Sequence, residues 1–142
     1  MAAITKMKLI ELDDRWIFPI ENLTVTQLRI DYSLVISLWV SQELFFNVAI
    51  EAPFQFINHN KETIKVTPET SEGVCSILDI LDATVQSAIA FKNGALELVF
   101  QNGCRIIAKP DYMYEAWNIA GPAGLLFVCK PSGEVESWIS NI

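Results

Sequence analysis

Two Asn-Gly dipeptides, separated by one short apolar run, constrain the fold of this chain more than any other feature. They are Asn93-Gly94 and Asn102-Gly103. Because Asn and Gly both tolerate positive φ, each pair suits the tight type I′ turn of a β-hairpin. Short apolar runs lie before, between and after the two turns, and Pro110 closes the last one. The pattern predicts a three-stranded antiparallel meander from Val85 to Ala108.

Strands are also expected on either side of this meander. The run from Leu34 to Val40 is apolar on much of both faces, which is typical of a central strand. Pro19 cannot donate to a strand ladder, so Trp16 to Ile20 is expected at an edge or in a loop. Phe54 to Ile57 is expected to continue the strand Leu44 to Ile50 beyond a bend near Pro53. The other expected strands are Val25 to Ile30, Leu125 to Cys129 and Val135 to Ile139, with shorter segments at Met7 to Leu12 (a strand or an arm) and Thr63 to Val66.

One segment has the periodicity of an amphipathic helix. Val74, Ile77, Leu78 and Leu81 fall at i, i+3, i+4 and i+7, which predicts a helix from Glu72 to Leu81. Thr70 or Ser71 is the expected N-cap. Together these patterns predict an α+β fold in a single domain, residues 1–142, in which two antiparallel meanders and a C-terminal hairpin accompany one helix.

The two halves of the chain resemble each other weakly. Aligning Leu34, Ile36 and Leu38 with Leu96, Leu98 and Phe100 also brings Phe45 beside Ile107. Each unit then contains a strand, a turn, an apolar strand, a turn, a strand and a proline. A repeated meander explains this pattern, and so does the general similarity of antiparallel hairpins.

The chain is acidic, with 17 Asp and Glu against 10 Lys and Arg and a formal net charge of −7. Such a surface disfavours nucleic acid and anionic membranes as partners and attracts basic proteins, although solubility alone also explains it. No apolar run approaches the roughly 20 residues of a membrane span. The first residues do not have the pattern of a secretory signal, so a cytoplasmic location is expected.

The residues that carry chemistry are few. Three cysteines with wide spacing and one histidine, His59, argue against a disulfide framework and a structural zinc site. Cys75 and Cys129 lie in apolar runs and are expected to be buried, whereas Cys104 follows a turn and is expected to be accessible. His59 has no evident orienting partner. We therefore expect no catalytic residues, no metal and no cofactor.

The most distinctive cluster is Tyr114, Glu115 and Trp117. One interpretation is a recognition patch, in which the aromatic rings give contact area and Glu115 meets an Arg or Lys. The other is structural and is favoured, because aromatic strand residues usually belong to the core. In it, Trp117 and Trp138 anchor the sheet, and Glu115 caps a turn or bonds backbone amides. The candidate partner-binding residues are Asp79, Asp82, Asp111, Tyr112, Tyr114 and Glu115.

Motifs in the C-terminal half resemble a family of small uncharacterised bacterial domains. These share an NG or DG hairpin, a Tyr-Glu-x-Trp segment followed by Gly-Pro, and a closing Gly-Glu…Trp hairpin. Here the motifs are Asn93-Gly94, Tyr114 to Trp117 with Gly121-Pro122, and Gly133-Glu134 with Trp138. The family has no activity to transfer. In size and style it is similar, by analogy, to the immunity proteins that accompany bacterial toxins.

Three classes of function follow from these observations. The first is a non-catalytic protein-binding module, most concretely an immunity protein whose acidic face covers the basic cleft of a nuclease-type toxin. The second is a small-ligand-binding or regulatory β-domain. The third, an enzyme, is disfavoured by the single histidine and the absent motifs.

Overall fold

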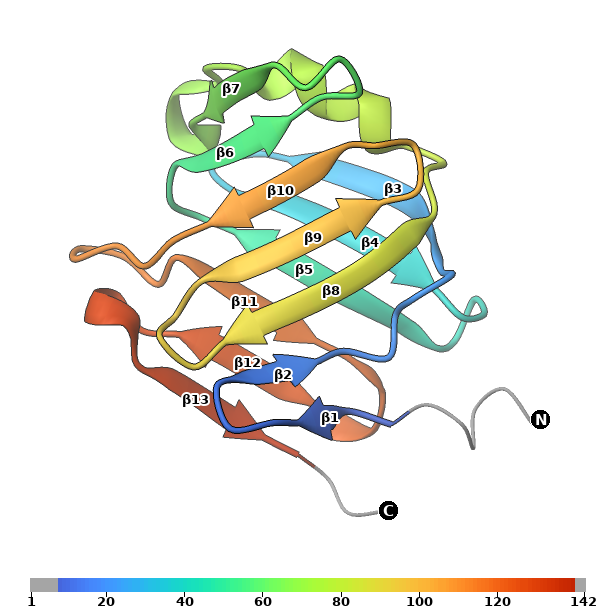
Figure 1. The fold of residues 1–142 in the computed structure, drawn as a ribbon, viewed down its shortest axis with the longest axis vertical. Helices are drawn as coiled ribbons and strands as arrows, with labels where there is room; N and C mark the ends of the chain where they lie inside the picture. The colour runs from blue at the N-terminus through green and yellow to red at the C-terminus, as the bar shows by residue number, and fades with distance from the viewer. Residues whose placement is uncertain (1–7, 140–142) are drawn as a thin grey trace.

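Two antiparallel sheets packed face to face make up the fold (Figure 1). The computed structural model describes residues 8–139. No helix within these residues is long and apolar enough to cross a membrane. We call the sheet nearest the viewer in Figure 1 the front sheet and the other the back sheet. Across the front sheet the strands are β1 (Ile10–Glu11), β2 (Arg15–Ile17), β8 (Val85–Phe91), β9 (Leu96–Phe100), β10 (Arg105–Ala108), β6 (Phe54–Ile57) and β7 (Thr63–Val66).

Six strands form the back sheet. In order across it they are β13 (Val135–Trp138), β12 (Leu126–Cys129), β11 (Trp117–Ala120), β5 (Phe45–Ile50), β4 (Leu34–Trp39) and β3 (Thr24–Ile30). The chain therefore has the predicted α+β composition, mostly antiparallel strand. Its helices are the short 3₁₀ segments η1 (Pro68–Thr70), η2 (Val74–Ile80), η3 (Pro122–Gly124) and η4 (Pro131–Gly133).

The predicted meander is confirmed. β9 pairs with β8 on one side and with β10 on the other, and both neighbours run antiparallel to it. The turns fall at the two Asn-Gly pairs, where Gly94 and Gly103 have φ values of 100° and 93°. Leu96, Leu98 and Phe100 alternate inward and are buried, because every second side chain of a strand faces the same side.

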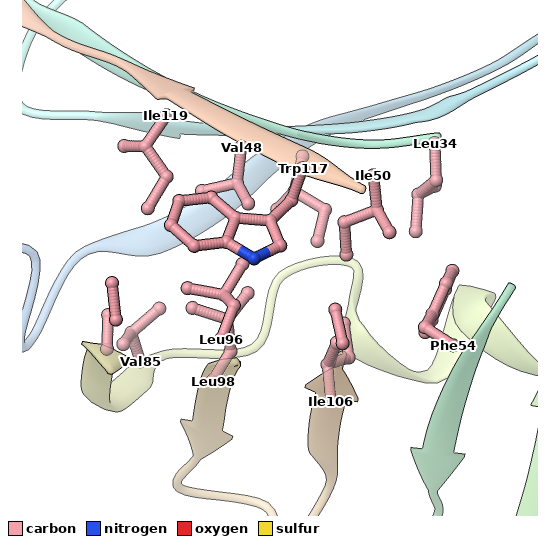
Figure 2. Packing of buried hydrophobic residues seen from close by; sticks show 14 of the residues in the cluster. Leu34, Val48, Ile50, Phe54, Val85, Leu96, Leu98, Ile106, Trp117 and Ile119 are labelled. Carbon is pink, nitrogen blue, oxygen red and sulfur yellow. The ribbon is translucent and has the colours of Figure 1, made fainter. Parts of the chain in front are cut away.

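The core fills the space between the two sheets (Figure 2). Trp117, Val48 and Ile50 point into it from the back sheet. Leu98 and Ile106 meet them from the front sheet. The predicted central strand is confirmed as β4, which lies between β3 and β5. The segment Trp16 to Ile20 is only partly at an edge or in a loop: Trp16 and Ile17 belong to β2, which pairs with β1 and β8. Pro19, which cannot donate to a ladder, lies in the loop after β2. Of the segment Met7 to Leu12, Met7 is outside the described residues, and β1 forms the sheet edge.

The internal repeat is visible in the topology. β3, β4 and β5 form a meander in the back sheet, and the next hairpin, β6 and β7, lies in the front sheet. β8, β9 and β10 form a meander in the front sheet, and the next hairpin, β11 and β12, lies in the back sheet. Each half thus contributes a hairpin to the sheet of the other, so that β6 pairs with β10 and β11 pairs with β5.

The junction between the halves has the same symmetry in its hydrogen bonds. Val25 N–H donates to the carbonyl oxygen of Ala83, and Val85 N–H donates to that of Leu23, each at 2.9 Å. Thr24 forms an antiparallel bridge with Thr84. Asn22 and Asp82, which precede these pairs, both adopt a left-handed conformation with φ of 71° and 67°. The two halves are therefore related by an approximate twofold axis that passes near Thr24 and Thr84.

The prediction for Phe54 to Ile57 is also wrong. Phe54 to Ile57 does not continue β5 in its own sheet but crosses to the front sheet as β6. Pro53 lacks an N–H group and restricts the backbone of the residue before it, so the ladder ends and the chain turns. After the turn Phe54 and Phe56 are buried from the opposite side of the core.

The helix prediction is right in position and wrong in type. The segment is a 3₁₀ helix that begins after Gly73 and has no side-chain cap, so Thr70 and Ser71 are not its N-cap. With three residues per turn, only positions three apart share a face. Ile77 and Ile80 are accordingly buried, whereas Leu78 and Leu81 are 59% and 42% exposed.

Candidate functional site

An acidic pocket of about 280 Å³ lies where four segments of the chain meet. These segments are the β3–β4 turn, the end of β5, η1 and the loop between β10 and β11. No Lys or Arg lines the pocket. Its walls combine carboxylates with phenol rings, which is the chemistry of a cation-binding pocket. The lining residues are Tyr32, Ser33, Glu51, Glu69 and Tyr114.

The β3–β4 turn presents Tyr32 to solvent. Asp31 Oδ1 accepts hydrogen bonds from the Ser33 backbone N–H at 2.9 Å and from Ser33 Oγ at 3.2 Å. These bonds fix the turn, and they lower the pKa of Asp31, to which the bond from the backbone N–H contributes most. Tyr32 at its tip is 80% exposed. A large aromatic ring held at a turn and left exposed is available for contact with a ligand.

A second side-chain turn positions Tyr114. Asp111 Oδ1 accepts hydrogen bonds from the backbone N–H groups of Met113 at 2.8 Å and Tyr114 at 3.2 Å. Tyr112 is 90% exposed and Tyr114, which reaches the pocket wall, is 50% exposed. Asp111 therefore shapes the loop.

Glu51 supplies the charge at the end of β5. Its backbone N–H donates to the carbonyl oxygen of Ala116 at 3.0 Å, which places it beside Glu115. Partial desolvation raises the pKa of Glu51, and the Glu115 carboxylate raises it further, although the side chain still reaches solvent. Among residues 8–139, no ion pair within 4.0 Å involves Glu51, Glu69 or Glu115. The pocket thus has negative charge with no cation to offset it.

The structure divides the predicted partner-binding residues between two places. Tyr114 lines the pocket, and Glu115 follows it in the loop that Asp111 shapes and that also carries Tyr112. Asp79 lies near the other end of β10, where its carbonyl oxygen accepts a 3.0 Å hydrogen bond from Asn102. The six residues Asp79, Asp82, Asp111, Tyr112, Tyr114 and Glu115 therefore do not make one continuous face.

Sequence reasoning missed four residues of the pocket: Tyr32, Ser33, Glu51 and Glu69. An exposed tyrosine between Asp31 and Ser33 is a local signal for a presented turn. The meeting of Glu51 with Tyr114, however, depends on the pairing of β5 with β11, which joins positions far apart in the sequence.

Trp117 belongs to the core, as the structural interpretation predicts, and is 0% exposed. Trp138 is 50% exposed and is not an anchor. It lies on the edge strand β13, opposite Leu126, on the outer face of the back sheet. Glu115 makes no side-chain hydrogen bond within the described part of the chain, so the expected cap is also absent.

Two of the three cysteine predictions are wrong. Cys104 is buried, because it lies two residues before Ile106 and faces the core on the same side. Cys75 is exposed on the outer side of η2. Cys129 is buried as expected. Burial raises the pKa of the Cys104 thiol, and the charge of Asp79 raises it further. A buried neutral thiol is a poor nucleophile.

His59 has a partner that the sequence did not reveal. Its Nδ1 atom lies 3.7 Å from Asp79 Oδ2, and both side chains are exposed. The prediction that His59 supports no catalysis stays untested. Within the described residues no group of three or more His, Cys, Asp or Glu side chains is placed to hold a metal ion.

The fold and the pocket define a two-sheet β-protein with an acidic, tyrosine-lined recess. Residues 16–139 match the profile of a family of unknown function (DUF6188), and the chain belongs to that family. This agrees with the expected resemblance to an uncharacterised family. No curated protein and no solved structure matches the chain.

Proposed function

We propose that the protein is a non-catalytic binding module that receives a Lys or Arg side chain of a basic protein partner. The observation that carries this proposal is the acidic pocket, which Glu51 and Glu69 line together with Tyr32 and Tyr114 and which no Lys or Arg of residues 8–139 lines. A carboxylate attracts the charge of the incoming group, and a phenol ring attracts it through its negative face.

We further propose that the partner is a nuclease-type toxin and that the protein neutralises it as an immunity protein. A nuclease needs a basic cleft to hold phosphates, and such a cleft complements a chain of net charge −7. The similarity in style to immunity proteins supports the same choice. Long-range attraction speeds the encounter, and the pocket holds one basic side chain of the cleft.

The raised pKa of Glu51 makes the pocket sensitive to acid. A cation that enters the pocket interacts with the ionised carboxylate. As pH falls through the raised pKa, Glu51 takes up a proton, and the attraction weakens at a higher pH than for an ordinary glutamate. Partner affinity should therefore decline on acidification as Glu51 takes up its proton.

The test is co-purification with the product of the adjacent gene, followed by kinetics of binding. Glu51→Gln/Glu69→Gln removes two charges from the pocket. Asp13→Asn/Glu43→Gln removes the same charge from exposed turns outside it. We expect the pocket variant to weaken binding at least about 30-fold, mainly through faster dissociation, as for the loss of a close charge pair.

The control variant should slow association slightly and leave dissociation unchanged, because peripheral charges act mainly on the encounter rate. Equal effects of the two variants would show that only net charge matters and would contradict the pocket. A partner that is not basic, or no partner at all, would contradict the function.

A further inference from the structure

The front sheet carries a second pocket whose chemistry is opposite to that of the first. Its volume is about 350 Å³, and it lies over β6, β7 and β10. Ligand pockets start at about this size, roughly 300 Å³. The residues that line its outward side are Pro53, Gln55, Thr63, Lys65, Ile107 and Lys109.

Strand register places these side chains on one surface. Gln55 lies opposite Lys65 on one neighbouring strand and opposite Ile107 on the other. Thr63 is two residues from Lys65, and Lys109 is two residues from Ile107, so each shares that outward face. The result is an apolar floor around Ile107 and Pro53, flanked by the two lysines, with the amide of Gln55 between their strands and the hydroxyl of Thr63 beside Lys65.

Within the described residues the two lysines have no carboxylate partner, as is also true of Arg29, Lys61 and Arg105. Lys92 Nζ lies 2.7 Å from Glu11, and Lys130 Nζ lies 2.9 Å from Glu136. Neither Lys65 nor Lys109 forms an ion pair with any described residue. Glu97, which lies opposite Ile107 on β9, does not line the pocket. Two unpaired positive charges therefore flank one apolar recess on an acidic protein.

We propose that this pocket binds a small amphipathic carboxylate. The apolar body of the ligand covers Ile107 and Pro53, which removes apolar surface from water. The carboxylate lies between the two ammonium groups, whose long flexible stems let them lean over the recess from both corners. Gln55 and Thr63 supply further hydrogen-bond donors. This site is separate from the acidic pocket, and the inference goes beyond the proposed partner binding.

The charge distribution also indicates which ligands the pocket rejects. A neutral molecule of the same shape keeps the apolar contact and loses both ion pairs. A cation of the same shape meets two like charges. The pocket therefore selects by the sign of the head group, and the apolar body sets how tightly a matching anion is held.

The experiment titrates the intact protein with decanoate and, separately, with decanol, and follows backbone amide chemical shifts. We expect decanoate to shift the amides of Gln55, Lys65 and Ile107 and to bind about tenfold more tightly than decanol. Lys65→Gln/Lys109→Gln should weaken decanoate binding about tenfold and leave decanol unchanged. Lys61→Gln, an exposed lysine in the adjacent β6–β7 turn, should change neither titration.

Three results would overturn the proposal. The first is decanol binding as tightly as decanoate. The second is equal decanoate affinity in the double variant and in the Lys61→Gln control. The third is an absence of shifts on β6, β7 and β10 up to millimolar decanoate. Because the lysines are exposed surface residues, the amide spectrum of each variant also reports directly that it is folded.

Discussion

The indole N–H of Trp117 donates a 2.8 Å hydrogen bond to the backbone carbonyl oxygen of Gly94, and both residues are buried. Trp117 is on β11 in the back sheet, and Gly94 is in the turn between β8 and β9 of the front sheet. The bond therefore connects the β11–β12 hairpin, which the C-terminal half contributes to the back sheet, to the β8–β9 turn of the front sheet. A methyl group at Gly94 would lie 2.6 Å from Pro110 Cγ and 2.7 Å from the Gly133 carbonyl oxygen.

Replacing Trp117 with Phe should lower the free energy of unfolding by about 2–4 kcal/mol. The change leaves the buried Gly94 carbonyl without its indole donor and opens a cavity where the larger ring was. Urea unfolding followed by circular dichroism measures the effect. Trp138→Phe, at a half-exposed position on β13, should change it by less than about 0.5 kcal/mol. Similar losses in both variants would contradict the anchoring role of Trp117.

Gly94→Ala should destabilise the protein much more than Gly124→Ala. Both glycines have positive φ, 100° and 78°, so alanine meets backbone strain of about 1–2 kcal/mol at either position. Only Gly94 adds a clash, since nothing lies within 4 Å of the methyl position at Gly124. Overpacking adds roughly 1–3 kcal/mol. Thermal unfolding of the two variants compares them directly, and equal shifts in Tm would show that strain alone acts at Gly94.

Glu51→Gln should stabilise the free protein at pH 7 while it weakens partner binding. The folded-state pKa of Glu51 is raised, so the protonated form favours the folded state. That contribution is present at low pH and is lost as pH rises through the folded pKa, whereas Gln keeps it at every pH. The Tm of the variant should exceed that of the wild type at pH 7, and the two should converge near pH 4. A lower Tm at pH 7 would show that the ionised carboxylate is stabilising.

One of the three thiols should react in the native protein. Cys75 is exposed, whereas Cys104 and Cys129 are buried, and burial raises the pKa of both thiols. A chromogenic disulfide reagent at pH 8 should modify one thiol per chain quickly and the other two only after unfolding in denaturant. Cys75→Ser should abolish the fast phase. A fast phase that survives this substitution would show that Cys104 or Cys129 is accessible.

Local signals in the sequence were sufficient to predict the meander of β8, β9 and β10. They were insufficient to predict that each half places a hairpin in the sheet of the other. Asn93-Gly94 and Asn102-Gly103 determine the turns of the meander, and alternation determines which side chains face inward. The placement of β6 depends on β10, which follows it after more than 40 residues, so no short-range pattern around Phe54 reports it. The spacing of Val74, Ile77, Leu78 and Leu81 is that of an α-helix, and nothing in it indicates the 3₁₀ helix that forms. The helix begins after Gly73, whose close approach to the Lys65 carbonyl oxygen is a tertiary contact that the local pattern does not report.

The candidate site was predictable only in part for the same reason. Tyr114 and Glu115 stood out because aromatic and acidic residues cluster there in the sequence. Glu51 and Glu69 have ordinary neighbours. Glu51 reaches Tyr114 through the pairing of β5 with β11, and Glu69 reaches it from η1, which follows β7 of the other sheet.

The exchange of hairpins between the halves also bears on how such a chain can arise. A single half would leave β5 without β11 and would leave β6 without β10, with unpaired edges in both places. Two identical half-length chains placed about a twofold axis would satisfy all of these edges for each other. Gene duplication and fusion of such a self-pairing ancestor produces this topology without any strand changing its partner. Once fused, each half depends on the other for strand pairing in both sheets, so the two can diverge in sequence but neither can be deleted.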